Sequence, residues 1–206
     1  VFGAPLHLVM EYQGKGYIPI VVENCIRFLW NRVNVEGLFR LAGSRGALEE
    51  LKKEFDSGNI PDLEKTNDPI LVGQLLKTFF RMLPEPIMTF ALYDKFLATQ
   101  SERNDETRLR MLRRLCDALP DPNRALLESF FLFLKHVESS SDMNRMSSRN
   151  IAIIFAPSFL RRKDETPQSM LADQHGIQGV LVDILGHPER MFGILNLNDI
   201  EEKYII

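Results

Sequence analysis

The spacing of apolar residues constrains this chain most, because it follows the helical period along nearly the whole sequence. Apolar side chains recur three and four residues apart, as they do on the buried face of an α-helix. Clear examples are the stripes at 21–30, 72–83 and 126–137. No segment alternates apolar and polar residues over a useful length, which a half-buried strand would require. The pattern therefore predicts an all-α protein.

Residues that start and stop helices divide this pattern into separate elements. We expect Ser44 to cap one helix, and Asp68, with the proline that follows it, to begin the next. Ser147 or Ser148 is expected to cap a later helix, and Pro157 is expected to stop it. These signals predict a compact bundle of about eight or nine helices without internal repeats.

The length of 206 residues fits one domain with an additional terminal segment. We predict a domain core at residues 1–165 and a C-terminal helical segment at 166–206 that packs on the core or completes it. The polar stretch 161–168 is expected to be the loop between them. The chain begins at Val1 without a methionine, so we expect it to be a piece of a longer protein.

Charge and cysteine content narrow the class of protein. The formal net charge is −3, which gives no overall basic field for nucleic acid or an anionic membrane. Cys25 and Cys116 lie too far apart for a zinc motif and are expected to be buried thiols in a reducing compartment. No apolar run approaches the roughly 20 residues of a membrane helix. We therefore expect a cytoplasmic protein.

The sequence offers no self-contained active site. It has no phosphate-binding loop of the form GxxxxGK[ST], no GxSxG elbow, no HExxH motif and no metal site. The four histidines are scattered and share no helical turn. Any chemistry would therefore have to be completed on a partner molecule.

The most informative stretch is the segment 36–44, in which Arg40 stands among apolar residues. Gly37 and Gly43 flank it and permit tight turns, while Leu38 and Phe39 can anchor the loop to the core. Arg40 can then project from a fixed base. The plainer alternative is a structural arginine that hydrogen-bonds to carbonyls of its own loop.

A second pair of basic residues lies on the helix expected at 69–83. Lys77 and Arg81 are four residues apart and share one face, where like charges destabilise the helix by a few tenths of a kcal/mol. No acid stands at position 73, 74 or 78 to offset them. An acidic partner surface would explain the pair, although a solvated helix face remains open as the alternative. Asn150 lies in the first turn of a later apolar helix, where it could also be a simple cap.

Taken together, these segments resemble the RhoGAP family. The resemblance begins at Phe2-Gly3-Ala4-Pro5-Leu6 and runs through Ile18-Pro19, Gly37-Leu38-Phe39-Arg40, Leu76-Lys77, Phe80-Arg81, Leu83-Pro84-Glu85-Pro86, Asn150-Ile151-Ala152 and Phe155-Ala156-Pro157. Motifs in this order and spacing over about 160 residues make the resemblance specific. Residues after about 165 carry no part of it.

The resemblance implies a role for several residues. Arg40 is expected to be an arginine finger, the residue inserted into the active site of a partner GTPase. Lys77 and Arg81 are expected to line the GTPase-binding face, with Arg81 also steadying the finger loop. The remaining contacts are expected from Asn144, Met146, Asn150 and Pro157.

The resemblance also implies a function, which is stimulation of GTP hydrolysis by a Rho, Rac or Cdc42-type small GTPase in its GTP-bound form. The domain is expected to act as a monomer without a cofactor, because the partner binds GTP and Mg²⁺. Membrane or cytoskeletal recruitment is expected from other regions of the full protein. One alternative is a scaffold with the same fold that binds a GTPase without activating it. Another is a helical lipid- or adaptor-binding domain, whose contacts would be Arg108, Arg110, Arg113, Arg114, Arg161, Arg162 and Lys163.

Overall fold

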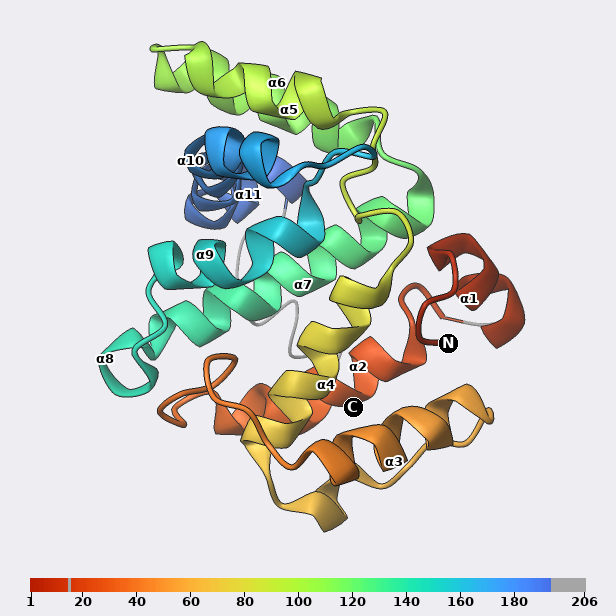
Figure 1. The fold of residues 1–206 in the computed structure, drawn as a ribbon. Helices are drawn as coiled ribbons and strands as arrows, with labels where there is room; N and C mark the ends of the chain where they lie inside the picture. Colours follow the sequence, from red (N-terminus) through yellow and green to blue (C-terminus); the bar gives the residue numbers. More distant parts are fainter. Residues whose placement is uncertain (15, 194–206) are drawn as a thin grey trace.

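A computed structural model describes residues 1–14 and 16–193 and consists of helices joined by loops (Figure 1). The prediction of an all-α bundle is confirmed. In chain order, the helices are α1 (Leu6–Gln13), α2 (Ile20–Leu29), η1 (Trp30–Arg32), α3 (Arg45–Asp56), η2 (Leu63–Thr66), α4 (Pro69–Met82), α5 (Tyr93–Ala98), η3 (Thr99–Ser101), α6 (Asp105–Asp117), α7 (Asp121–Ser139), α8 (Ser141–Asn144), α9 (Ser148–Phe159), α10 (Pro167–Gly186) and α11 (Pro188–Phe192).

The described residues form eleven α-helices, more than the eight or nine expected. The additional elements are short or weakly patterned. The helix α1 buries only Leu6 and Val9, and α8 has four residues, so neither produces a long apolar stripe. None of the helices in the described part of the chain is long and apolar enough to cross a membrane.

Most helix starts agree with the capping signals in the sequence. The Ser44 hydroxyl accepts a hydrogen bond from the backbone N–H of Ala47, and Asp68 accepts two, from Ile70 and Leu71. The Ser147 hydroxyl accepts from the N–H of Asn150. Each cap satisfies donors that a helix N-terminus leaves without an intrahelical partner.

The expectation that Pro157 stops its helix is wrong. The helix α9 continues to Phe159, with Pro157 inside its last turn. The missing N–H would have bonded the carbonyl of Ile153, which lies on the exposed side of the helix. Phe159 is fully buried, so packing holds the last turn in place.

A cluster of phenylalanines forms the centre of the bundle, around the long helix α7. Phe80 of α4 and Phe130 of α7 have ring centroids 4.4 Å apart, and Phe155 and Phe159 of α9 lie 5.2 and 5.5 Å from Phe130. Aromatic pairs at these separations stabilise a core beyond the area that they bury. This cluster fixes α4 and α9 side by side, and both helices carry expected site residues. Cys25 and Cys116 are buried free thiols, as expected.

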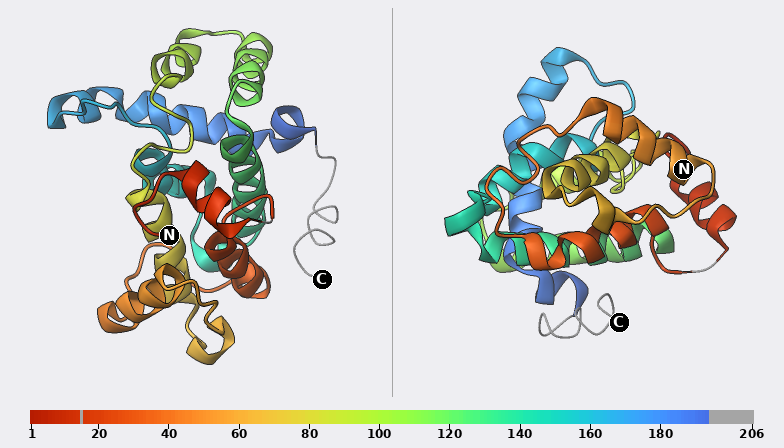
Figure 2. Two further views of the ribbon diagram at one scale, coloured as in Figure 1. Left: turned by 90° about the vertical axis from the view of Figure 1, so that its right-hand side faces the viewer. Right: turned by 90° about the horizontal axis from the view of Figure 1, so that it is seen from below.

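The helix α10 lies across α9, and its two halves differ. The second half is packed into the core through Ile177, Val180, Leu181, Ile184 and Leu185. The first half buries none of its residues and projects from the body of the protein (Figure 2). The expected C-terminal segment thus begins as a helix joined to the same core, and its residues 194–206 lie outside the described residues.

Candidate functional site

Arg40 lies at the tip of a tight turn in the loop between η1 and α3, hereafter the finger loop (residues 33–44). Gly37 has a φ of 85°, and its carbonyl accepts hydrogen bonds from the N–H groups of Arg40 and Leu41, both at 2.9 Å. Phe39 has a φ of 64°, a left-handed conformation that non-glycine residues rarely adopt. The side chain of Arg40 is exposed, while that of Phe39 is fully buried. The turn therefore directs Arg40 outward from an anchored base.

Aromatic packing holds the base of this loop against the core. The Phe39 ring meets Phe155 of α9 and Phe133 of α7 edge-on, at centroid distances of 5.1 and 6.3 Å. Gly73 of α4 makes room for it, since a Cβ there would lie 3.0 Å from the Leu38 side chain and 3.4 Å from Phe39. Glycine at position 73 thus lets the finger loop lie close against α4.

Two polar side chains of α4 bind the finger loop on either side of Arg40. The Lys77 ammonium donates to the carbonyl of Phe39 at 2.8 Å. The Gln74 side-chain oxygen accepts from the N–H of Gly43 at 2.7 Å. Arg81, which was expected to steady this loop as well, makes no hydrogen bond with any described residue, and Lys77 binds the loop instead. Gln74 was missed, although it lies three residues before Lys77 and shares its helix face.

The alternative of a structural Arg40 is not supported by these contacts. Within residues 1–14 and 16–193, the Arg40 side chain makes no hydrogen bond or ion pair. The carbonyl of the preceding residue is bonded by Lys77 instead. Arg40 is thus the side chain that the loop presents, and the loop does not depend on it.

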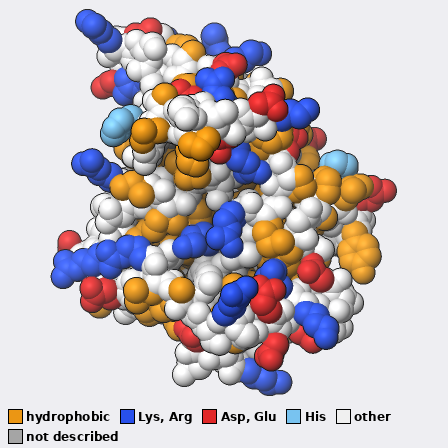
Figure 3. All heavy atoms as spheres, in the orientation of Figure 1, with side chains coloured by type: hydrophobic (Ala, Val, Ile, Leu, Met, Phe, Trp, Pro, Cys, Tyr) orange, Lys and Arg blue, Asp and Glu red, His pale blue; other side chains and the backbone are white. Residues whose placement is uncertain are grey.

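A basic cleft of about 380 Å³ lies between α4 and α9. It is lined by Lys77, Arg81, Ile154, Pro157, Ser158 and Arg161. Figure 3 shows basic side chains gathered across the middle of this face, over α4. Burial, and then the charge of Arg81, lower the pKa of Lys77, while burial lowers the pKa of Arg161. Among the described residues, three cations and no carboxylate line the cleft. An incoming acidic group would relieve the repulsion between Lys77 and Arg81. Arg161 already interacts with Glu85 and Glu165, which lie outside the lining.

Asn150 and Pro157 lie along the same side of α9. They are seven residues apart, with Ile154 of the cleft between them, a spacing that places all three on one helix face. The Asn150 amide donates to the carbonyl of Arg145 at 2.8 Å, and its side chain is partly exposed. The structure therefore brings Arg40, Lys77, Arg81, Asn150 and Pro157 onto one surface, hereafter the finger face.

Asn144 and Met146, which were expected to contact a partner, are both 0% exposed in the structure. The Asn144 amide donates to the carbonyls of Val33 and Val137, both at 2.7 Å, and its oxygen accepts from the N–H of Met146 at 2.7 Å. Asn144 thus joins the start of the finger loop, the end of α7 and the segment before α9. Its role here is to hold these segments together.

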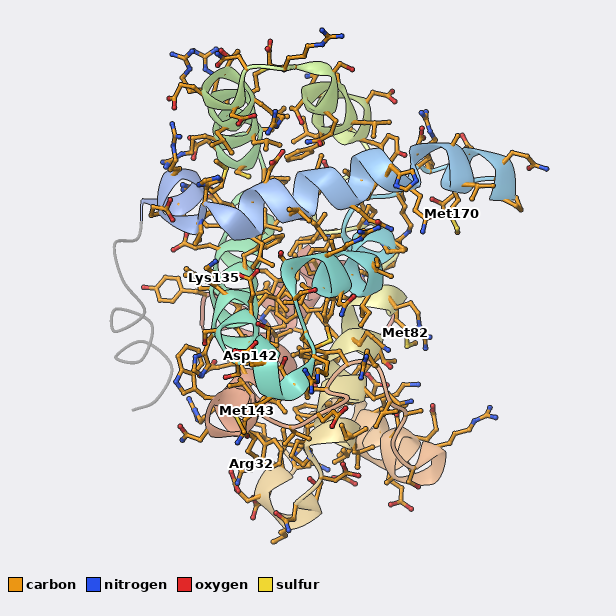
Figure 4. The ribbon with its side chains drawn as sticks, turned by 90° about the vertical axis from the view of Figure 1, so that its left-hand side faces the viewer. Arg32, Met82, Lys135, Asp142, Met143 and Met170 are labelled. Carbon is orange, nitrogen blue, oxygen red and sulfur yellow. The ribbon has the colours of Figure 1, made fainter. Side chains whose placement is uncertain are left out.

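Exposed methionines around α9 were not expected from the sequence. Met82 of α4, Met143 of α8 and Met170 of α10 are 36, 59 and 42% exposed, and Figure 4 shows them around α9. Met170 also lines a more apolar groove of about 560 Å³ between α9 and α10, which shares Pro157 with the basic cleft. Flexible apolar side chains of this kind adapt to partner surfaces.

Comparison with known proteins identifies the family. The model of the RhoGAP domain matches residues 19–164, which carry all of the residues on the finger face. The chain belongs to the RhoGAP family. It is 36% identical over 195 residues to the Rho GTPase-activating protein gacY of Dictyostelium discoideum, covering 93% of this chain and 27% of that protein. It is 34% identical over 198 residues to mouse Rho GTPase-activating protein 24, covering 93% of this chain and 26% of that protein.

A solved structure agrees with this assignment. The crystal structure of human Rho GTPase-activating protein 15 superposes with a TM-score of 0.88 at 27% identity, covering 94% of this chain and 92% of that one. The curated relatives extend well beyond the RhoGAP domain, since this chain spans about a quarter of their length.

Two of the four arginines in the basic cluster on α6 of this RhoGAP domain are neutralised within the fold. Arg108 is paired with Asp105 and Asp183, both at 2.8 Å, and Arg113 is paired with Asp117 at the same distance. In the second basic cluster, Arg162 is paired with Asp173 at 3.0 Å. These arginines are tied to neighbouring elements, which disfavours the lipid-binding alternative.

Proposed function

We propose that this domain stimulates GTP hydrolysis by a GTP-bound Rho-family small GTPase, into whose active site Arg40 inserts. The observation that carries the proposal is the exposed Arg40 on a loop bound to α4 on both sides, by Lys77 at Phe39 and by Gln74 at Gly43. Membership of the RhoGAP family supports the same conclusion. The domain would supply one catalytic side chain to an active site that the partner builds.

The chemistry of phosphoryl transfer suits an arginine in this position. Negative charge moves toward the bridging oxygen and the γ-phosphoryl group in the transition state, where a guanidinium offers a permanent charge and fixed donors. Because the loop is anchored before the partner arrives, little ordering remains to be done during the reaction. Arginine fingers supplied to other small GTPases accelerate hydrolysis by about 10³–10⁵. That range corresponds to about 4–7 kcal/mol of activation free energy.

The rest of the finger face would hold the partner. The basic cleft of Lys77, Arg81 and Arg161 is suited to acidic side chains of the GTPase, and Asn150 would hydrogen-bond to its switch region. GTP and Mg²⁺ belong to the partner in this proposal, and the domain acts as a monomer without a cofactor. We place its action in the cytoplasm, with recruitment to membranes or the cytoskeleton through other regions of the full protein.

The proposal is tested by single-turnover phosphate release from one GTPase each of the Rho, Rac and Cdc42 branches. At least one should hydrolyse its GTP about 10³-fold faster or more with saturating domain. A domain that binds a GTPase tightly in its GTP state but leaves its hydrolysis unchanged would support the scaffold alternative instead.

Arg81→Ala is expected to weaken binding of the GTP-loaded GTPase about three- to tenfold, because it removes one cation from the cleft. The affinity should also depend less steeply on salt, since fewer screened charges remain. The rate at saturating domain should change little, because Arg81 makes no hydrogen bond with the described residues of the finger loop and Lys77 and Gln74 hold it. Lys77→Ala should lower both affinity and rate, since it also frees the carbonyl of Phe39.

The matched control for this pair is Arg110→Ala, which removes an exposed cation from α6, at the far end of the bundle from the finger loop (Figure 1). Titrations at two or more salt concentrations measure all three variants. If Arg110→Ala weakens binding as much as Arg81→Ala does, the effect is one of overall charge, and the cleft is a solvated surface.

A further inference from the structure

We propose that Gln74 is a positioning residue for Arg40. By holding Gly43, Gln74 would fix the second end of the turn that carries the finger, so that Arg40 is already aligned when the partner docks. This inference rests on the proposed function of Arg40 as the finger.

The hydrogen bond between Gln74 and the finger loop is short and spans 31 positions of the chain, with the N–H of Gly43 lying 2.7 Å from the side-chain oxygen. The loop backbone lies directly against α4 at this point. A Cβ added to Gly43 would lie 2.9 Å from the Cα of Leu71, closer than real Cβ atoms come to backbone. Glycine at position 43 thus allows the approach, and Gln74 supplies the acceptor that fixes it.

The two contacts of α4 bracket the finger. Lys77 binds the residue just before Arg40, and Gln74 binds the third residue after it. Because Gln74 and Lys77 are three apart on one helix, both anchor points belong to one rigid element. The turn itself holds residues 40 and 41 through the Gly37 carbonyl, but without Gln74 the segment from Leu41 to Gly43 would have no bond to α4. The exposed Leu41 and Ala42 add no buried anchor of their own.

Loss of the second anchor should therefore affect the rate more than the binding. The finger contributes most in the transition state, where its guanidinium must lie within hydrogen-bonding distance of the transferring phosphoryl group. A misplacement of about 1 Å can cost a factor of up to about 10² in rate. The basic cleft is lined by other residues and should bind the ground state as before.

The test compares Gln74→Met, which keeps the length of the side chain but removes the oxygen, with Gln74→Glu, which keeps an oxygen acceptor. In single-turnover assays at saturating domain, Gln74→Met should lower the rate about tenfold, with affinity for the GTP-loaded partner within about twofold. Gln74→Glu should stay within about threefold of the wild-type rate. Thermal melting confirms that each variant is folded.

A double variant separates positioning from a general structural effect. If Gln74 acts through the finger, Gln74→Met should cause no further loss of rate in an Arg40→Ala background. An equal tenfold loss in that background, or a Gln74→Met rate close to the wild type, would overturn this inference alone. An Arg40→Ala variant that still stimulates hydrolysis would instead overturn the proposed function.

Discussion

Arg40→Ala is expected to abolish most of the stimulation of GTP hydrolysis, lowering the single-turnover rate by about 10³ or more. The contact that it removes is strongest with the charge of the transition state, so the loss should fall on the chemical step. Affinity for the GTP-loaded partner should change much less. The melting temperature should hardly change, because the exposed Arg40 side chain makes no hydrogen bond with the described part of the chain.

Three comparisons sharpen this test. Arg40→Lys should rescue little, since an ammonium lacks the planar fork of the guanidinium. Affinity for a partner loaded with GDP and aluminium fluoride, which mimics the transferring phosphoryl group, should fall more than affinity for the ground state. Arg45→Ala removes another exposed cation, at the start of α3, and should retain the rate. If Arg40→Ala keeps stimulation within about threefold of the wild type, the finger assignment is wrong.

The fold could be predicted largely from local patterns. The stripes that became α2, α4 and α7 are long enough to show the helical period, and the caps at Ser44, Asp68 and Ser147 need only neighbouring residues. The short helix α8 escapes such patterns because its length gives no period. The continuation of α9 past Pro157 also escapes them, because the burial of Phe159 depends on α4 and α7.

The candidate site was only partly predictable, because its decisive contacts join distant parts of the chain. Family motifs pointed to Arg40, Lys77 and Arg81 as surface residues. Lys77, and not Arg81, hydrogen-bonds to the finger loop. This bond joins Lys77 to Phe39, 38 positions apart in the sequence, so local patterns could not predict it. The direction of the Asn144 side chain could not be read from a polar stretch of sequence, since it depends on hydrogen bonds to the carbonyls of Val33 and Val137. The burial of Met146 likewise depends on the tertiary fold. Local sequence therefore gives the residue types of the site, and tertiary packing assigns their roles.

The burial of Asn144 leads to a prediction about stability. Asn144→Ala would leave the carbonyl of Val33 and the N–H of Met146 without the partner that this side chain provides, in a site from which water is excluded. The carbonyl of Val137 would lose one of its hydrogen bonds and keep the one from the N–H of Ser140. Each buried group left unsatisfied costs about 1–3 kcal/mol, and the losses in one network do not simply add. We expect a fall of about 3 kcal/mol in the free energy of unfolding. For a domain of this size, the melting temperature should fall by roughly 6–12 °C.

Denaturant unfolding measures this effect, and Asn34→Ala serves as its control. Asn34 is exposed in the finger loop beside Val33, so its loss should change the free energy of unfolding by less than about 0.5 kcal/mol. At a temperature where the Asn144→Ala variant remains folded, its hydrolysis rate should stay far above that of Arg40→Ala, because the Asn144 side chain is buried and bonds only to this chain. This prediction would be contradicted if Asn144→Ala were as stable as the wild type but bound the GTPase weakly. Asn144 would then become exposed on docking and contact the partner directly, as the family resemblance first implied.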